Sequence, residues 1–86
     1  MGKMTKNEIV ALLAEKNPDR LDQCVQYADA FLEYVEATDN IESNGTIVQH
    51  PRTMNPIVNP YTAIRDKALK KLQTFYQVDA VGLWES

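Results

Sequence analysis

The two residue types that most often carry chemistry, histidine and cysteine, each occur once in this chain. His50 stands beside Pro51 in a segment without periodicity, which is typical of a turn or a surface position. Cys24 lies within an apolar helical stripe, which is typical of an inert buried thiol. No nucleophile has a neighbouring base, and the scattered glycines cannot cradle a phosphate. The sequence therefore predicts no enzyme, and no cofactor or metal is expected.

Three lysines near the end of the chain form the remaining candidate site. At about 100° per residue, a helix over residues 60–76 places Lys67, Lys70 and Lys71 on the face opposite its apolar residues. Arg52, in the preceding linker, is expected beside this face. Such a face can hold nucleic-acid phosphates without reading sequence, or it can be an ordinary solvated surface. Both interpretations stay open from the residues alone.

The distribution of charge favours the second half of the chain as the side that meets a polyanion. The formal net charge is −3. Residues 1–43 hold four basic and nine acidic residues, a net charge of −5. Residues 44–86 hold five basic and three acidic residues, a net charge of +2. A polyanion such as DNA should therefore prefer the second half.

The chain has the size and composition of one small globular domain, residues 1–86, with 44% hydrophobic and 24% charged residues. A domain of this size has a thin core. No apolar run approaches the roughly 20 residues of a membrane span, and the N-terminus lacks the apolar stretch of a signal peptide. A cytoplasmic protein without membrane contact is expected, and the single cysteine allows no internal disulfide.

The helical elements can be placed from their capping residues and apolar spacing. Thr5 and Glu8 have the spacing of a capping box, which starts a helix reaching to about Glu15. Asn17-Pro18 is expected to cap a central core helix over residues 18–38. Its apolar stripe comprises Leu21, Cys24, Val25, Ala28, Phe31, Leu32 and Val35, with Tyr27 and Tyr34 at the flank. Its solvated acidic band comprises Asp22, Asp29, Glu33 and Glu36 and should point away from DNA.

A short hairpin and a third helix complete the expected fold. Asn44-Gly45 suits a type I′ turn, with Ile41 before it and residues 46–48 after it. An irregular linker follows, and Asn59-Pro60 caps the helix over residues 60–76. Its inward residues are Tyr61, Ile64, Ala68, Leu69, Leu72, Phe75 and Tyr76. The fold class is all-α: a small bundle of three to four helices with a short β-hairpin between the second and third helices.

Two further residues are candidates for an oligomer interface. Arg65 lies within the apolar stripe of the third helix, where it must snorkel, pair with an acid from another helix, or face a neighbouring subunit. Asp79 can cap a last short turn through residues 80–84. Trp84 in that turn covers either the core or a partner.

The order of these elements resembles the small-subunit family of tailed-phage terminases. The resemblance covers residues 18–83 and is carried by the Gly45-centred hairpin, the Asn59-Pro60 helix and the closing Gly82-Leu83. Within that helix, Ala68 and Leu72 also match structural positions. The resemblance implies a helical, non-enzymatic homo-oligomer that recognises viral double-stranded DNA in the bacterial host cytoplasm. It also implies delivery of that DNA to the terminase large subunit, which supplies the ATPase and nuclease.

This chain differs from the family pattern at its C-terminal end. Such proteins commonly continue after the closing Gly-Leu with a small hydroxyl residue, proline and arginine, whereas here Trp84-Glu85-Ser86 follows. A DNA or large-subunit contact made from such a basic tail is therefore not expected. The alternative function is a small helical module that binds only another protein, through Tyr27, Tyr34 or Trp84. DNA binding with a steep salt dependence would separate the two.

Overall fold

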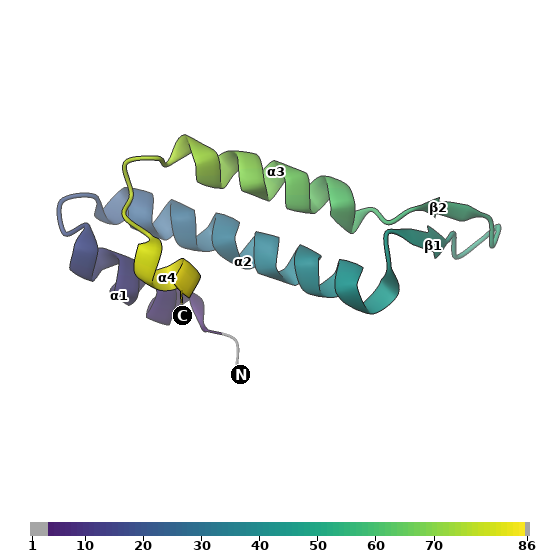
Figure 1. Cartoon of the computed structure of the whole chain (residues 1–86), viewed down its shortest axis with the longest axis horizontal. Coiled ribbons are helices and arrows are strands. Elements are labelled where there is room, and N and C mark those ends of the chain that lie inside the picture. Colours follow the sequence, from purple (N-terminus) through teal and green to yellow (C-terminus); the bar gives the residue numbers. More distant parts are fainter. Residues whose placement is uncertain (1–3, 86) are drawn as a thin grey trace.

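The computed structural model describes residues 4–85 and contains four helices and one two-stranded sheet in that range. The order is α1 (Lys6–Lys16), α2 (Leu21–Asn44), β1 (Ile47–Gln49), β2 (Pro56–Val58), α3 (Tyr61–Thr74) and α4 (Val81–Glu85). The predicted helical bundle with a hairpin between the second and third helices is confirmed. The molecule is elongated, 50 × 27 × 18 Å, and the hairpin projects from one end (Figure 1).

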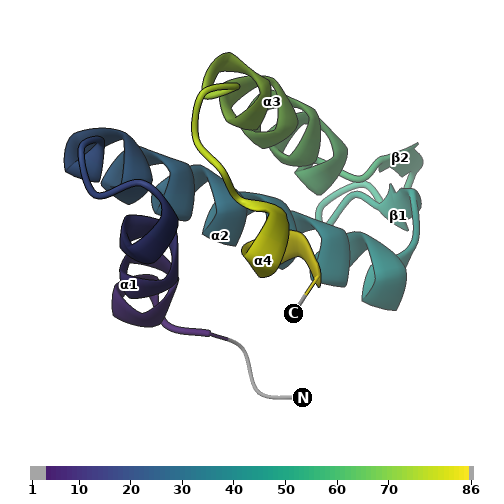
Figure 2. The same ribbon diagram turned by 60° about the vertical axis from the view of Figure 1, so that its left-hand side comes forward.

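The long helix α2 is the centre of the arrangement. The most extensive contact joins α2 to α3, which runs back along it in the opposite direction (Figure 1). Helix α1 crosses the first half of α2 steeply, and the short α4 lies against α1 and α2 (Figure 2). All the other helices therefore depend on α2 for their position.

The core is built mainly from small side chains and lies where α1, α3 and α4 meet the first half of α2. Its largest fully buried side chains are Ile9, Leu13 and Cys24. Alanines fill much of the remainder, namely Ala28, Ala30, Ala37, Ala68 and Ala80. The prediction for the α2 stripe is partly wrong, because Leu21 and Val25 are exposed and Phe31, Leu32 and Val35 are only half-buried. The stripe is rotated towards Tyr27 and Ala30, which are buried. The Tyr27 ring contacts Phe75 at the end of α3, and its hydroxyl accepts from Trp84 of α4.

The predicted start of α1 is confirmed. The Glu8 amide donates to the Thr5 hydroxyl at 3.3 Å, and the Thr5 amide donates to the Glu8 carboxylate at 3.2 Å. This reciprocal pair satisfies two first-turn donors. An ion pair of 3.0 Å between Lys6 and Asp29 then joins α1 to α2.

Asn17 does not cap α2, contrary to the prediction. Helix α2 begins at Leu21 with Arg20 at its N-cap, and Asn17 is instead the C-cap of α1. Its buried side-chain amide donates to the carbonyls of Leu13 at 2.9 Å and Asp79 at 3.0 Å. Its side-chain oxygen accepts from the Asp79 amide at 2.9 Å. Asn17 therefore ties the C-terminal segment to the α1–α2 corner across 62 positions.

The predicted type I′ turn at Asn44-Gly45 is also wrong. Helix α2 continues to Asn44, and Gly45 ends it with φ of +86° and an amide that donates to the Ile41 carbonyl at 2.7 Å. A positive φ favours glycine at the end of a helix as much as in a hairpin turn, so the dipeptide alone could not decide between them.

The hairpin is formed by the segment expected to be a linker. Strand β1 pairs antiparallel with β2 in the register Ile47 to Val58, Val48 to Ile57 and Gln49 to Pro56. Ile47 and Val58 are exposed together on one face, while Val48 and Ile57 are half-buried on the other. Pro56 lacks a donor and opens the strand, a position that tolerates proline.

Helix α3 is shorter than predicted and turns a narrower face to the core. It ends at Thr74, where the Phe75 amide bonds to the Leu72 carbonyl, and Tyr76 beyond it is 82% exposed. Ala68 and Leu72 are buried as predicted, but Ile64 and Leu69 are exposed. The buried face of α3 therefore consists of Ala68 and Leu72 alone.

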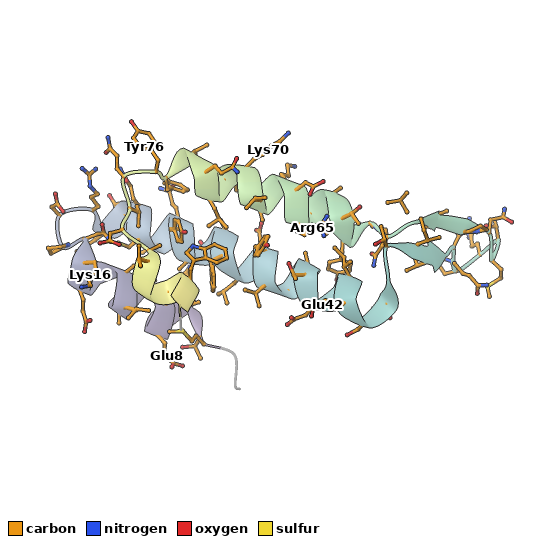
Figure 3. The ribbon with its side chains drawn as sticks, in the orientation of Figure 1. Glu8, Lys16, Glu42, Arg65, Lys70 and Tyr76 are labelled. Carbon is orange, nitrogen blue, oxygen red and sulfur yellow. The ribbon has the colours of Figure 1, made fainter. Side chains whose placement is uncertain are left out.

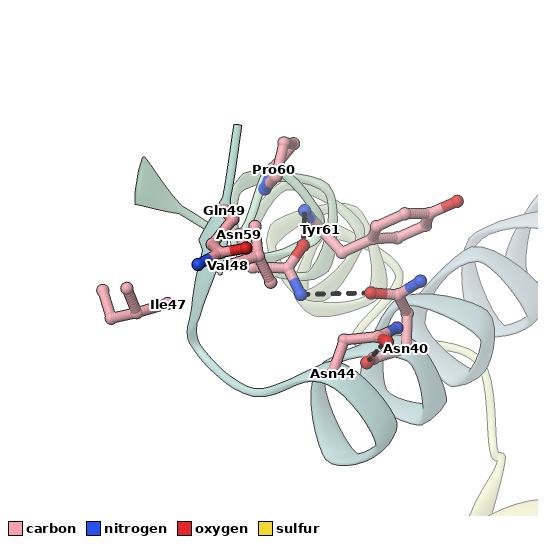
Figure 4. Close-up of a pocket in the computed structure, with 8 residues that line it drawn as sticks. All are labelled: Asn40, Asn44, Ile47, Val48, Gln49, Asn59, Pro60 and Tyr61. Atoms are coloured by element: carbon pink, nitrogen blue, oxygen red, sulfur yellow. Dashed lines mark hydrogen bonds between the residues drawn. The ribbon is translucent and has the colours of Figure 1, made fainter. Parts of the chain in front are cut away.

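Asn59 joins three elements and is almost completely buried, at 2% exposure. Its side-chain oxygen accepts from the Tyr61 amide at 3.0 Å, which supports the predicted cap of α3, although Pro60 is the last residue before the helix. Its side-chain amide donates to the Gly45 carbonyl at 2.9 Å and to the Asn40 side-chain oxygen at 3.1 Å (Figure 4). Asn59 thus fixes the end of α2 and the start of α3 at once.

We predict that Leu13→Ala lowers the free energy of unfolding by about 2–5 kcal/mol, because it leaves a cavity among fully buried side chains. Leu21→Ala is the matched control: Leu21 is 55% exposed, so its loss should change stability by about 0.5 kcal/mol or less. Denaturant unfolding of the two variants measures the difference. Equal losses would contradict the rotated stripe of α2.

We predict that Asn59→Asp destabilises the protein by about 2 kcal/mol or more, although aspartate caps helices well. The substitution removes both donated hydrogen bonds and buries a charge beside two acceptors. Asn55→Asp, at an exposed turn position, is the control and should be close to neutral. Thermal unfolding followed by circular dichroism compares them, and a neutral Asn59→Asp would leave Asn59 as a simple cap.

Candidate nucleic-acid interface

The three lysines of α3 are all exposed but do not share one environment. Lys70 points directly away from α2 into solvent (Figure 3). Lys67 and Lys71, one turn apart, instead line a groove between α3 and α2. The predicted basic face is therefore divided, with one lysine outermost and two at the edge of a shared groove.

That groove has an acidic wall. Its volume is about 450 Å³, and it is lined by Glu33 and Glu36 from α2 and by Tyr61, Ile64, Lys67 and Lys71 from α3. The sequence placed the acidic band of α2 on a solvated face, which is correct, since all four acids of that band are exposed. It did not predict that two of them would lie next to the lysines. Two nearby carboxylates reduce the attraction of Lys67 and Lys71 for phosphate.

Arg52 lies in the turn that joins the two strands, and it is exposed. The turn is closed by hydrogen bonds from the His50 amide to the Asn55 carbonyl and from the Met54 amide to the His50 carbonyl, each 2.8 Å. The His50 ring nitrogen Nδ1 accepts from the amides of Arg52 at 3.1 Å and Thr53 at 3.4 Å. Since this turn is at the far end of the projecting hairpin, Arg52 and the lysines are not brought together (Figure 1).

Arg65 lies on the other flank of α3 from the groove and is partly exposed. Its Nε atom lies 3.6 Å from the carboxylate of Asp66, its neighbour on the same helix. This contact is a weak surface ion pair, because 37% of the Arg65 side chain and 65% of the Asp66 side chain are exposed. The expected arrangement in which Arg65 pairs with an acid from another helix is therefore not the one that forms, because Asp66 lies on the same helix.

Trp84 is held by an aromatic cluster on α2. Its indole N–H donates to the Tyr27 hydroxyl at 2.6 Å. Its ring stands edge-on to Phe31, at 4.9 Å between ring centres, and to Tyr34, at 5.6 Å. Asp79 accepts from the Val81 amide at 3.3 Å, so the predicted cap of the last turn is present. Trp84 therefore covers the core while remaining 47% exposed.

Cys24 is completely buried, as predicted, and its thiol donates to the Asn17 carbonyl with a sulfur–oxygen distance of 3.8 Å. Burial raises the pKa of this thiol, and the negative charge of Asp19 raises it further. Within residues 4–85, no group of three or more His, Cys, Asp or Glu side chains is placed to hold a metal ion. None of the helices described is long and apolar enough to cross a membrane.

The chain matches the model of a known protein family. The family model described as phage terminase, small subunit, matches residues 5–77, which is most of the chain. No curated protein and no solved structure matches the chain. This small helical protein with a projecting hairpin is therefore a member of the phage terminase small-subunit family.

We predict that Tyr27→Phe lowers the free energy of unfolding by about 1 kcal/mol, because it leaves the Trp84 indole N–H without its acceptor. The same change should alter the fluorescence of Trp84, which is the only tryptophan. Tyr34→Phe is the matched control, since it keeps the ring contact with Trp84. Identical spectra and stabilities for the two variants would argue against the hydrogen bond.

Proposed function

We propose that this protein is a non-enzymatic adaptor of the packaging machinery, which binds viral double-stranded DNA and delivers it to the terminase large subunit in the host cytoplasm. Membership of the terminase small-subunit family over residues 5–77 is the observation that carries the proposal. The ATPase and nuclease activities would then belong to the large subunit alone. A homo-oligomer fits this role, since many weak contacts along one DNA add up to useful affinity.

We further propose that DNA is held through phosphate contacts by Lys67, Lys70, Lys71 and Arg52. Lys70 and Arg52 are the strongest candidates, because both side chains are exposed, Lys70 points away from α2 and Arg52 stands at the tip of the projecting hairpin. Lys67 and Lys71 share their groove with Glu33 and Glu36, so each should contribute less. Contacts of this kind position DNA without reading its sequence.

Arg65 and Trp84 are proposed as part of the surface between copies in the oligomer. Both side chains are partly exposed, at 37% for Arg65 and 47% for the Trp84 residue as a whole. A partner covering Trp84 would add apolar burial to a domain whose own core is small. Arg65 at the edge of such a contact could exchange its weak pair with Asp66 for one across the interface.

We predict that Arg52→Gln combined with Lys70→Gln reduces the salt dependence of DNA binding. Each lost phosphate contact lowers the magnitude of the log–log salt slope by about 0.9, so the double variant should lose up to about 1.8 per subunit engaged. The melting temperature should stay unchanged, because both side chains point outward.

The measurement is the DNA affinity of each protein between about 50 and 200 mM salt, where phosphate contacts produce large changes. Lys16→Gln, an exposed lysine on α1 away from α3, is the control for a general charge effect (Figure 3). An unchanged salt slope in the folded double variant would show that Arg52 and Lys70 do not contact DNA phosphates. Absence of DNA binding by the parent protein at low salt would overturn the adaptor role and favour a module that binds only protein.

A further inference from the structure

The turn at the tip of the hairpin holds Met54 in a backbone conformation that does not suit its side chain. Met54 has φ of +60°, and within residues 4–85 it is the one non-glycine residue with a positive φ. This conformation favours glycine, and a larger side chain in it costs free energy. Hydrogen bonds between His50 and residues 52–55 hold the turn, so the strain is built into the folded state.

Burial does not account for the choice of methionine at this position. The residue is 59% exposed, so the chain carries the backbone strain and an exposed apolar side chain together. Glycine or asparagine would form the turn more readily. Strain of this kind is concentrated at functional sites, and Met54 therefore indicates a contact with a partner outside this chain.

The charge along the hairpin favours a polyanion as that partner. Residues 43–65 contain no Asp or Glu, although the whole chain has a net charge of −3. Arg52 is exposed in the same turn as Met54, and the hairpin projects away from the acidic band of α2 (Figure 1). The tip can therefore approach a phosphate backbone without bringing a carboxylate of its own beside it.

We propose that the hairpin tip enters the minor groove of double-stranded DNA and that Met54 inserts between two base pairs as an apolar wedge. The proposal rests on the DNA-binding function proposed above, and it gives that function a site and a mode of contact. Apolar wedges unstack a base step and bend the duplex, and methionine is one of the side chains that do so. Arg52 beside the wedge would lie in the negative potential of the groove.

The exposed face of the hairpin argues against the major groove. A two-stranded ribbon reads the major groove through polar side chains that reach base edges. Ile47, Gln49, Pro56 and Val58 share the exposed face, and of these only Gln49 has a hydrogen-bonding side chain. Unstacking costs least at flexible pyrimidine–purine steps, so the wedge would favour TA and CA steps without contacting base edges.

The test uses short duplexes in which 2-aminopurine, a base whose fluorescence rises when it is unstacked, stands at a single TA step. The parent protein should raise this fluorescence, and should raise it less when a stiff AA step replaces TA. Met54→Gly should lose most of the rise, because glycine has no side chain to insert. Its salt slope should stay unchanged, since methionine carries no charge. Its melting temperature should stay the same or rise, because glycine relieves the positive φ.

Two matched variants and two competitors control for other effects. Met54→Leu keeps a long apolar side chain and should keep the fluorescence rise. Tyr76→Ala removes an 82% exposed aromatic residue outside the hairpin and should leave the rise unchanged. Netropsin, which fills the minor groove, should displace the protein, whereas methyl green, which binds in the major groove, should not.

Three results would overturn the wedge and leave the adaptor role standing, provided that DNA binding keeps its steep salt dependence. They are an unchanged 2-aminopurine signal with the parent protein, an equal rise with Met54→Gly, and displacement by methyl green rather than netropsin. Absence of DNA binding by the parent protein at low salt would overturn the wedge and the adaptor role together, so the two failures can be told apart.

Discussion

Two buried asparagines hold the ends of α2, and the positions of the other elements depend on them. The side chains buried on α2 and α3 are mostly alanines, which bury little area per residue. Asn17 fixes the C-terminal segment at the first end of α2, and Asn59 fixes the hairpin and α3 at the other. A buried amide is strongly directional because each unmade hydrogen bond has a cost. In a thin core, these bonds specify where the elements meet.

The parts of the fold that short-range patterns control could be predicted from the sequence. The capping box of α1 needs only residues three apart, and it forms as expected. The order of helices and hairpin follows from periodicity and breakers, and Ala68 and Leu72 are buried because they lie at the centre of the α3 stripe. The family was also accessible from this order of elements, as the match over residues 5–77 confirms.

The errors concern residues whose partners are distant in sequence. Asn17 and Asn59 both precede proline and look like helix caps. Asn17 instead bonds to Asp79, whereas Asn59 caps α3 as predicted but also donates to Asn40 and Gly45. No sequence pattern near either asparagine indicates these distant acceptors. Gly45 likewise suits both a hairpin turn and the end of a helix, and the continuation of α2 to Asn44 decided between them.

The candidate site shows the same limit in electrostatic terms. Helical projection gives the angle of each lysine around α3 but not the charge of the helix beside it. Packing places Glu33 and Glu36 next to Lys67 and Lys71, while Lys70 stays in solvent and Arg52 is carried away on the hairpin. One copy therefore offers DNA a few separated cations rather than a continuous basic surface. Under the proposed adaptor role, useful DNA affinity would require several copies on one duplex, and the arrangement of copies, rather than the net charge of one chain, would determine how their cations align with the phosphates.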